Sequence, residues 1–213
     1  MNKVAKRTVS ALTVAAAVVA LILSVPPKWF PPAFALVYAL ALAEFVQLLR
    51  RKVALSSARG VFSLVFGAAT LALPFVALPF VALTRGAAWM LYLVFVVKLS
   101  DMGGFALGVA FGRHKLCPSI SPNKSWEGLL GSVLASVALS LAFVGVTGFP
   151  WWKAVAFGVI AALVGTFGDL VESKFKRWVG VKDSSTFLPA GMGGVLDTFD
   201  SLLFAPAILA LLI

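Results

Sequence analysis

The feature that most constrains this chain is a succession of long apolar runs separated by short basic segments. A helix needs about 20 mostly apolar residues to cross a bilayer, and seven runs reach or approach that length. The chain is 61% hydrophobic and 12% charged, whereas soluble domains are typically about 45–50% apolar and about 25% charged. The sequence therefore predicts an all-α, polytopic membrane protein with one domain over residues 1–213, whose spans are 8–25, 32–49, 61–83, 87–112, 126–148, 151–168 and 195–213.

The basic residues between the runs predict the orientation of the chain. Cytoplasmic loops carry an excess of Lys and Arg. If the N-terminus is cytoplasmic and seven spans alternate, only Lys28, Arg85 and Lys153 fall in outside segments, with Lys98 inside a span. The basic start before 8–25 also fits a signal peptide, but we interpret this run as a retained first helix. We expect the C-terminus outside and an inner-membrane protein whose site faces the cytoplasm.

The net charge of +10 does not indicate a nucleic-acid partner, because the basic residues form short clusters between apolar runs instead of one soluble face. Cys117 is the single cysteine, which excludes an intramolecular disulfide and a cysteine-based metal site. His114 is also alone, which argues against a multi-histidine metal centre.

Acidic residues are few and unevenly placed. All but one of the eight acidic residues lie between 101 and 200, and the exception is Glu44. Asp101 falls inside an apolar run, where a carboxylate is costly and usually faces a polar cavity, a partner or an ion. Asp169, Asp197 and Asp200 fall at or near the ends of such runs, on the expected cytoplasmic side, and we interpret them with Asp101 as candidates for a polar site, whereas we interpret Glu44 as structural or interfacial.

Two sets of polar residues near the C-terminus share helical faces. Asp197 and Asp200 are three residues apart, so a helix that starts near Gly194 places both on one side. Asp169, Ser173 and Lys176 follow the i, i+4, i+7 pattern of a single helical stripe.

Lys182 and Asp183 lie in a polar loop between these two stripes, and glycines follow at 191, 193 and 194. Glycine lets backbone N–H groups approach a ligand closely, and the start of the next helix favours anions. Carboxylates, lysines and a glycine-rich turn together predict a metal–phosphate site. Mg²⁺ suits such a site, since it is usually held by one or two carboxylates plus substrate phosphates.

A second polar segment spans residues 121–128. Pro122 and Asn123 predict a turn. Ser125 can cap the next helix, with Glu127 in its first turn. Lys124 would add a full positive charge beside that helix start, which favours phosphate binding.

Simpler interpretations remain open at this point. Asp197 and Asp200 can cap a helix and neutralise nearby lysines. Asp101 can form a structural ion pair with Lys98, three residues earlier. The basic residues at 174–177 can anchor the chain to anionic lipids.

The C-terminal motifs resemble a known family. Residues 173–177, 182–185 and 193–201 resemble the C-terminal signature of phosphatidate cytidylyltransferases (CDP-diacylglycerol synthases), and 100–128 is also similar to that family. The resemblance covers about 100–213, a catalytic signature region, whereas the spans of 1–99 match only in hydrophobic character. Met192 stands where the family usually has histidine, and Thr198 where it has arginine. Ala190 and Gly191 occupy a position where one residue is expected.

The resemblance implies that CTP and phosphatidic acid react, with Mg²⁺, to give CDP-diacylglycerol and pyrophosphate. The resemblance does not decide whether a second cation binds or whether the protein forms a homodimer. The lipid bilayer is a further partner. The rivals are a lipid kinase of the polyprenol or phytol type, and a transporter whose path is lined by Asp101 and Lys98. The metal ligands it implies are Asp169 and Asp197, within a catalytic set of Asp169, Lys182, Asp183, Asp197 and Asp200; substrate binding is assigned to Ser121, Asn123, Lys124, Ser173, Lys176, Arg177, Gly193 and Gly194.

Overall fold

The computed structural model describes residues 19–20, 22–181 and 194–213. Helices dominate these residues, and the strands there form a single two-stranded hairpin. This agrees with the predicted all-α class. The elements are η1 (Pro27–Trp29), α2 (Phe30–Arg50), α3 (Ala58–Arg85), α4 (Ala87–Phe111), β1 (Lys115–Cys117), β2 (Ser121–Ser125), α5 (Trp126–Ala142), α6 (Val144–Thr147), α7 (Trp151–Val179), α8 (Val195–Phe199) and α9 (Ala205–Ala210).

Four helical segments of the described chain are long and apolar enough to cross a membrane: η1 with α2, α3, α4 and α7. They confirm helices over the predicted spans 32–49, 61–83 and 87–112. The run 151–168 is also helical, but α7 continues to Val179 and ends at Gly180, which adopts the left-handed conformation at φ 82°. The run 126–148 is divided, since α5 ends at Ala142 and the short α6 follows.

The prediction of a single spanning helix over 195–213 is wrong. This segment forms two short helices, α8 and α9, joined by a turn at residues 200–204. Several of its apolar side chains are buried in the protein interior, with Leu202 4% and Leu209 0% exposed, although Leu211 near the end is 86% exposed. Hydropathy cannot distinguish such a buried segment from one that faces lipid. Most of the run 8–25 lies outside the described residues, and the number of spans and the sides of the two termini stay predictions.

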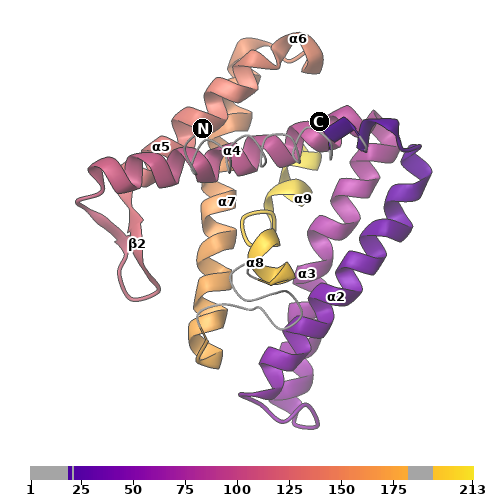
Figure 1. The fold of residues 1–213 in the computed structure, drawn as a ribbon, viewed down its shortest axis with the longest axis vertical. Helices are drawn as coiled ribbons and strands as arrows, with labels where there is room; N and C mark the ends of the chain where they lie inside the picture. Colours follow the sequence, from indigo (N-terminus) through magenta and orange to yellow (C-terminus); the bar gives the residue numbers. More distant parts are fainter. Residues whose placement is uncertain (1–18, 21, 182–193) are drawn as a thin grey trace, which may run out of the picture.

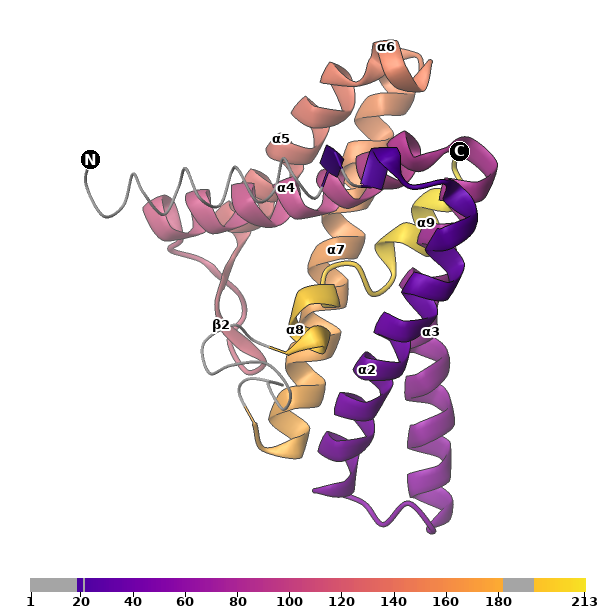
Figure 2. The same cartoon turned by 45° about the vertical axis from the view of Figure 1, so that its right-hand side comes forward.

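The helices surround the C-terminal segment. Figure 1 shows α2 and α3 side by side, α7 on the opposite side, and α8 and α9 between them. In both views α4 runs crosswise to α3 and α7 near one end of these helices, and α5 extends away from it (Figure 2). Residues of α8 and α9 are therefore held inside a frame made by α2, α3, α4 and α7.

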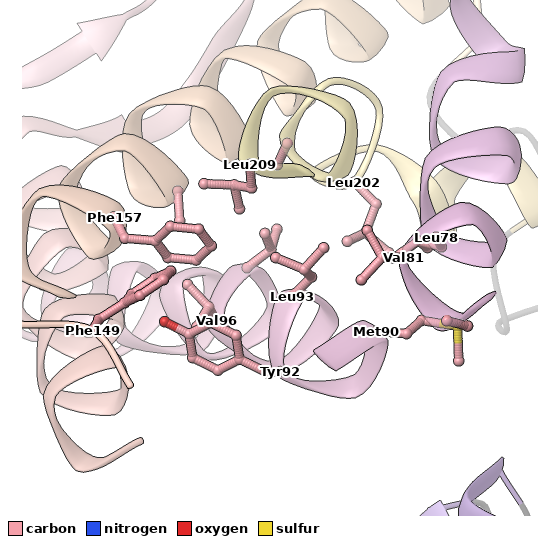
Figure 3. Close-up of a cluster of buried hydrophobic side chains, with 14 of the residues drawn as sticks. Leu78, Val81, Met90, Tyr92, Leu93, Val96, Phe149, Phe157, Leu202 and Leu209 are labelled. Carbon is pink, nitrogen blue, oxygen red and sulfur yellow. The ribbon is translucent and has the colours of Figure 1, made fainter. Parts of the chain in front are cut away.

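The main hydrophobic core packs these helices against one another. Side chains of α3, α4, α7 and α9 meet in one cluster, in which Tyr92 stacks on Phe157 with 5.4 Å between ring centroids (Figure 3). The buried Tyr92 hydroxyl lies 3.1 Å from Ser140 Oγ, so its polar end is satisfied.

Small residues bring α4 and α5 into close contact. A Cβ added to Gly131 would lie 2.4 Å from the backbone oxygen of Gly103, so the two backbones almost touch. Small residues allow this kind of approach between helices in membrane proteins. The hairpin connects α4 to α5, so this close packing also fixes the hairpin in its place beside α7.

The hairpin corrects one local prediction and confirms another. Pro122 and Asn123 lie within β2, and the turn is at residues 118–120, where Ile120 N–H donates to Cys117 O over 3.2 Å. Proline is tolerated there because β2 has a free edge in this two-stranded sheet. Ser125 caps α5 as predicted, since its Oγ accepts from Gly128 N–H at 3.1 Å.

Candidate active site

The centre of the candidate site is an acid–lysine cluster along α7, made by Lys98, Lys124, Asp169, Glu172, Lys176, Asp197 and Asp200. Asp169 forms an ion pair with Lys124 of β2, and its carboxyl group is close enough to that of Asp200 for the two to interact. Two turns further along α7, Lys176 Nζ lies 2.7 Å from Glu172 Oε2 and 2.7 Å from Asp197 Oδ1. The predicted stripe of Asp169 and Lys176 therefore connects β2, α7 and α8.

Asp197 has a double role in the local structure. Its Oδ1 faces Lys176, and its Oδ2 accepts a hydrogen bond from Gly194 N–H over 2.8 Å. The second contact caps α8, as the simpler interpretation of this residue predicted. The first contact joins α8 to α7, which capping alone does not require.

Lys98 of α4 holds the segment that carries Asp200. Its ammonium donates to Thr198 O at 2.8 Å and to Ser201 Oγ at 3.0 Å, and lies 3.8 Å from Asp200 Oδ1. The predicted pair with Asp101 also exists, at 3.9 Å. Lys98 thus contributes more to positioning residues 198–201 than to neutralising its own helix neighbour.

Two cavities reach this cluster from different sides. One has a volume of about 560 Å³ and lies between α4, α5, α7 and the hairpin. Polar residues are prominent in its lining: Asp101, Lys115, Asn123, Lys124, Ser125, Ser132, Thr166 and Asp169. The other, of about 240 Å³, is an apolar crevice between α2, α3, α7 and the α8–α9 segment, and Glu172 and Asp200 are the acidic residues among its lining.

The structure brings together many, but not all, of the residues assigned from sequence. Asp169, Lys124, Lys176, Asp197 and Asp200 meet as described, Gly194 begins α8, and Asn123 lines the polar cavity. Ser121 lies at the far end of β2, opposite Cys117. In the described part of the chain, no ion pair joins Arg177 to the cluster and no side-chain hydrogen bond joins Ser173 to it. Lys182, Asp183 and Gly193, together with the atypical Met192, lie outside the described residues.

Sequence reasoning missed three residues. Glu172 is four residues before Lys176, a spacing that signals a helical ion pair. Lys98 was considered only with Asp101, although an intramembrane lysine generally needs strong partners. Glu44 was interpreted as structural or interfacial, yet it is fully buried and contacts α8.

Glu127 directly precedes Gly128, which lines the polar cavity. Its carboxylate accepts from His114 N–H at 3.2 Å and lies 2.6 Å from His114 Nδ1. Hydrogen bonds from its own backbone N–H and from His114 lower the pKa of Glu127 to about 2. Glu127 therefore ties the hairpin to the start of α5, which agrees with its interpretation as a helix-start residue.

The donor set suits a hard cation. The carboxyl groups of Asp169 and Asp200 lie close enough to interact, and two carboxylates completed by phosphates and water are a usual environment for Mg²⁺. Within the described ranges, no group of three or more His, Cys, Asp or Glu side chains is arranged to hold a metal by itself. The residues therefore fit a metal that shares its coordination with a phosphate substrate.

Known proteins identify the family. The model of the cytidylyltransferase family matches residues 53–213. A phosphatidate cytidylyltransferase from Staphylococcus aureus (strain COL) is 42% identical over 132 residues, which cover 61% of this chain and 50% of the relative. One from Mycobacterium bovis (strain ATCC BAA-935 / AF2122/97) is 43% identical over 123 residues, which cover 56% of this chain and 39% of the relative.

This chain belongs to the cytidylyltransferase family, because the match covers most of its length. The resemblance seen in the sequence is thereby confirmed. The aligned part spans half or less of the length of either relative.

Proposed function

We propose that this protein transfers the cytidylyl group of CTP to phosphatidic acid, which gives CDP-diacylglycerol and pyrophosphate for membrane phospholipid synthesis. The observation that carries the proposal is the acid–lysine cluster, which lies between a polar cavity and an apolar crevice. Membership of the cytidylyltransferase family and relatives named phosphatidate cytidylyltransferase support it.

The chemistry needs positioning more than a protein nucleophile. An oxygen of the lipid phosphate forms a bond to the α-phosphorus of CTP, and the bond from that phosphorus to the bridging oxygen of the β-phosphate breaks. Pyrophosphate leaves with the bonding electrons. Orienting two polyanions and neutralising charge on the leaving group can lower the barrier substantially, and Lys124 and Lys176 are the lysines we assign to the phosphates.

Asp169 and Asp200 would hold Mg²⁺, with Asp197 as a further ligand. The ion would supply electrostatic stabilisation to the phosphates when bound. Lys124 then has two tasks, since it balances the Asp169 carboxylate without substrate and reaches into the polar cavity beside Asn123.

The two cavities suggest that each substrate binds in a different cavity. The polar cavity of about 560 Å³ suits a nucleotide, and the crevice of about 240 Å³ suits part of an acyl chain. Phe62 and Phe66 line the crevice and are 70% and 65% exposed, so they would face lipid at its mouth. Lipid and nucleotide phosphates would meet at α7. We further propose that the protein lies in the cell membrane with this site on the cytoplasmic side.

One assay separates this function from its rivals. Purified protein receives Mg²⁺, phosphatidic acid and CTP labelled at either the α- or the γ-phosphate. Label from the α-phosphate in lipid, with release of pyrophosphate, is the expected result. Label from the γ-phosphate in lipid would indicate a lipid kinase instead. No nucleotide turnover, combined with solute flux into sealed vesicles, would indicate a transporter.

A further inference from the structure

Glu44 of α2 is a fully buried carboxyl group in an apolar setting. Its side chain is 0% exposed and lies beside Phe45, Leu48 and Leu49, which are themselves buried. Oε2 accepts a hydrogen bond from Leu196 N–H over 3.1 Å, and Oε1 has no hydrogen-bond partner among the residues that the structure describes. Burying a carboxylate with so little compensation is costly, so its place in the core calls for a reason beyond packing.

The partner of Glu44 is the backbone that precedes Asp197. Leu196 is the second residue of α8, and its N–H has no acceptor within that helix. An isolated helix of five residues is not stable by itself, so α8 depends on outside contacts for its position. Its further contacts include the Phe199 ring, 4.6 Å from that of Phe75, the Asp197–Lys176 pair, and the hydrogen bond from Lys98 to Thr198 O.

We propose that Glu44 is a positioning residue, which fixes α8 on α2 and so sets where the Asp197 carboxylate points. This proposal rests on the proposed function. Glu44 lies before residues 53–213, the region that matches the family, so α2 would add a contact to the site from outside that region. A displacement of about 1 Å can cost about 100-fold in rate, which makes such a contact consequential.

A purely structural role predicts a different response to substitution. If Glu44 served only to fill the core, leucine would fill the same space without a buried carboxyl group, and activity would persist. If Glu44 positions α8, leucine leaves Leu196 N–H without its acceptor and frees α8 to shift. Glutamine keeps one carbonyl oxygen that can accept from Leu196 N–H, so it should restore function.

The test compares Glu44→Leu, Glu44→Gln and the control Leu48→Ala, which removes packing from the same cluster one turn along α2 and leaves the hydrogen bond. Hydrogen–deuterium exchange is measured on the full chain in detergent, together with CTP-dependent turnover. In Glu44→Leu we expect faster exchange confined to residues 194–201, and kcat lower by about 10- to 100-fold with little change in the KM for CTP. Glu44→Gln should stay within about threefold of wild type. Leu48→Ala should lower the melting temperature but leave kcat near that of the wild type.

Wild-type exchange at 194–201 in Glu44→Leu would overturn the proposal, as would wild-type kcat in that variant or equal losses in Glu44→Gln. An inactive wild-type protein would instead overturn the proposed function. In that case the exchange comparison alone decides whether Glu44 holds α8.

Discussion

Lys176 of α7 and Asp197 of α8 form an ion pair with 2.7 Å between Nζ and Oδ1, across 21 residues of sequence. Both side chains are largely buried, at 14% and 18% exposed. The pair joins the long helix α7 to the C-terminal segment, and Lys176 also pairs with Glu172, which lines the apolar crevice. A site for two polyanionic substrates needs such a concentration of lysines and carboxylates.

Asp197→Asn tests the carboxylate. Asparagine retains an oxygen that can accept from Gly194 N–H, so α8 should remain capped. We expect the rate of CTP-dependent conversion of phosphatidic acid to fall by about 100-fold or more, a loss typical of removing a group that stabilises the transition state. Pyrophosphate release measures the rate, and gel filtration in detergent checks the fold. Full activity in a folded variant would refute the role of Asp197 as a metal ligand.

Neighbouring lysines on α7 provide a matched comparison. Lys176→Ala leaves the Glu172 and Asp197 carboxylates without their shared partner, which should destabilise the protein by about 3 kcal/mol and abolish turnover. Lys174 is exposed, so Lys174→Ala should change stability by less than about 0.5 kcal/mol. Thermal unfolding in detergent compares the two variants. Equal losses of stability in the two variants would mean that the ion pairs of Lys176 do not cause the destabilisation.

Metal dependence tests the carboxylates of Asp169 and Asp200. Chelation of divalent cations should abolish turnover, and Mg²⁺ should restore it. Asp169→Asn should shift the Mg²⁺ concentration needed for half-maximal activity upward by about 10-fold or more, because one of few ligands is lost. Titration of activity against Mg²⁺ gives this value. An unchanged midpoint would remove Asp169 from the metal site.

Thr70→Trp tests the apolar crevice. Thr70 of α3 lines the crevice, and a large side chain there should obstruct an acyl chain. We expect the KM for phosphatidic acid to rise about 10-fold, or about 1.4 kcal/mol, with the KM for CTP unchanged. Thr84→Trp is the control: Thr84 is on the same helix and makes the same kind of hydrogen bond, to Phe80 O, but does not line the crevice. Equal changes in both variants would contradict the assignment.

Gly131→Ala tests the close packing of α4 on α5. The new methyl group would lie 2.4 Å from Gly103 O, a backbone atom that cannot move alone. We expect a destabilisation of about 1–3 kcal/mol, the usual cost of overpacking. Gly145→Ala is the matched control, because nothing lies within 4 Å of the added Cβ. Denaturation in detergent should show a lower midpoint for Gly131→Ala alone.

Local features were predictable wherever neighbours in sequence decide them. Ser125 caps α5, α8 starts after Gly194, and Asp169 and Lys176 share one face of α7, because capping and helical periodicity act over a few residues. The turn expected at Pro122 was wrong, since a free edge can accept proline in a strand. The helix expected over 195–213 was also wrong, since hydropathy records how apolar a segment is and not what surrounds it.

The sequence by itself determined that the chain forms helices long and apolar enough to cross a membrane and that it carries the motifs of the cytidylyltransferase family in its C-terminal half. Apolar run length and short motifs carry that information locally. Only the tertiary structure decided which charges meet: Lys124 with Asp169, Lys98 with residues 198–201, and Glu44 with Leu196. These contacts join residues 45 to 152 positions apart, and the crossing of α4 over α7 and the seating of α8 on α2 bring them together, which no local pattern encodes.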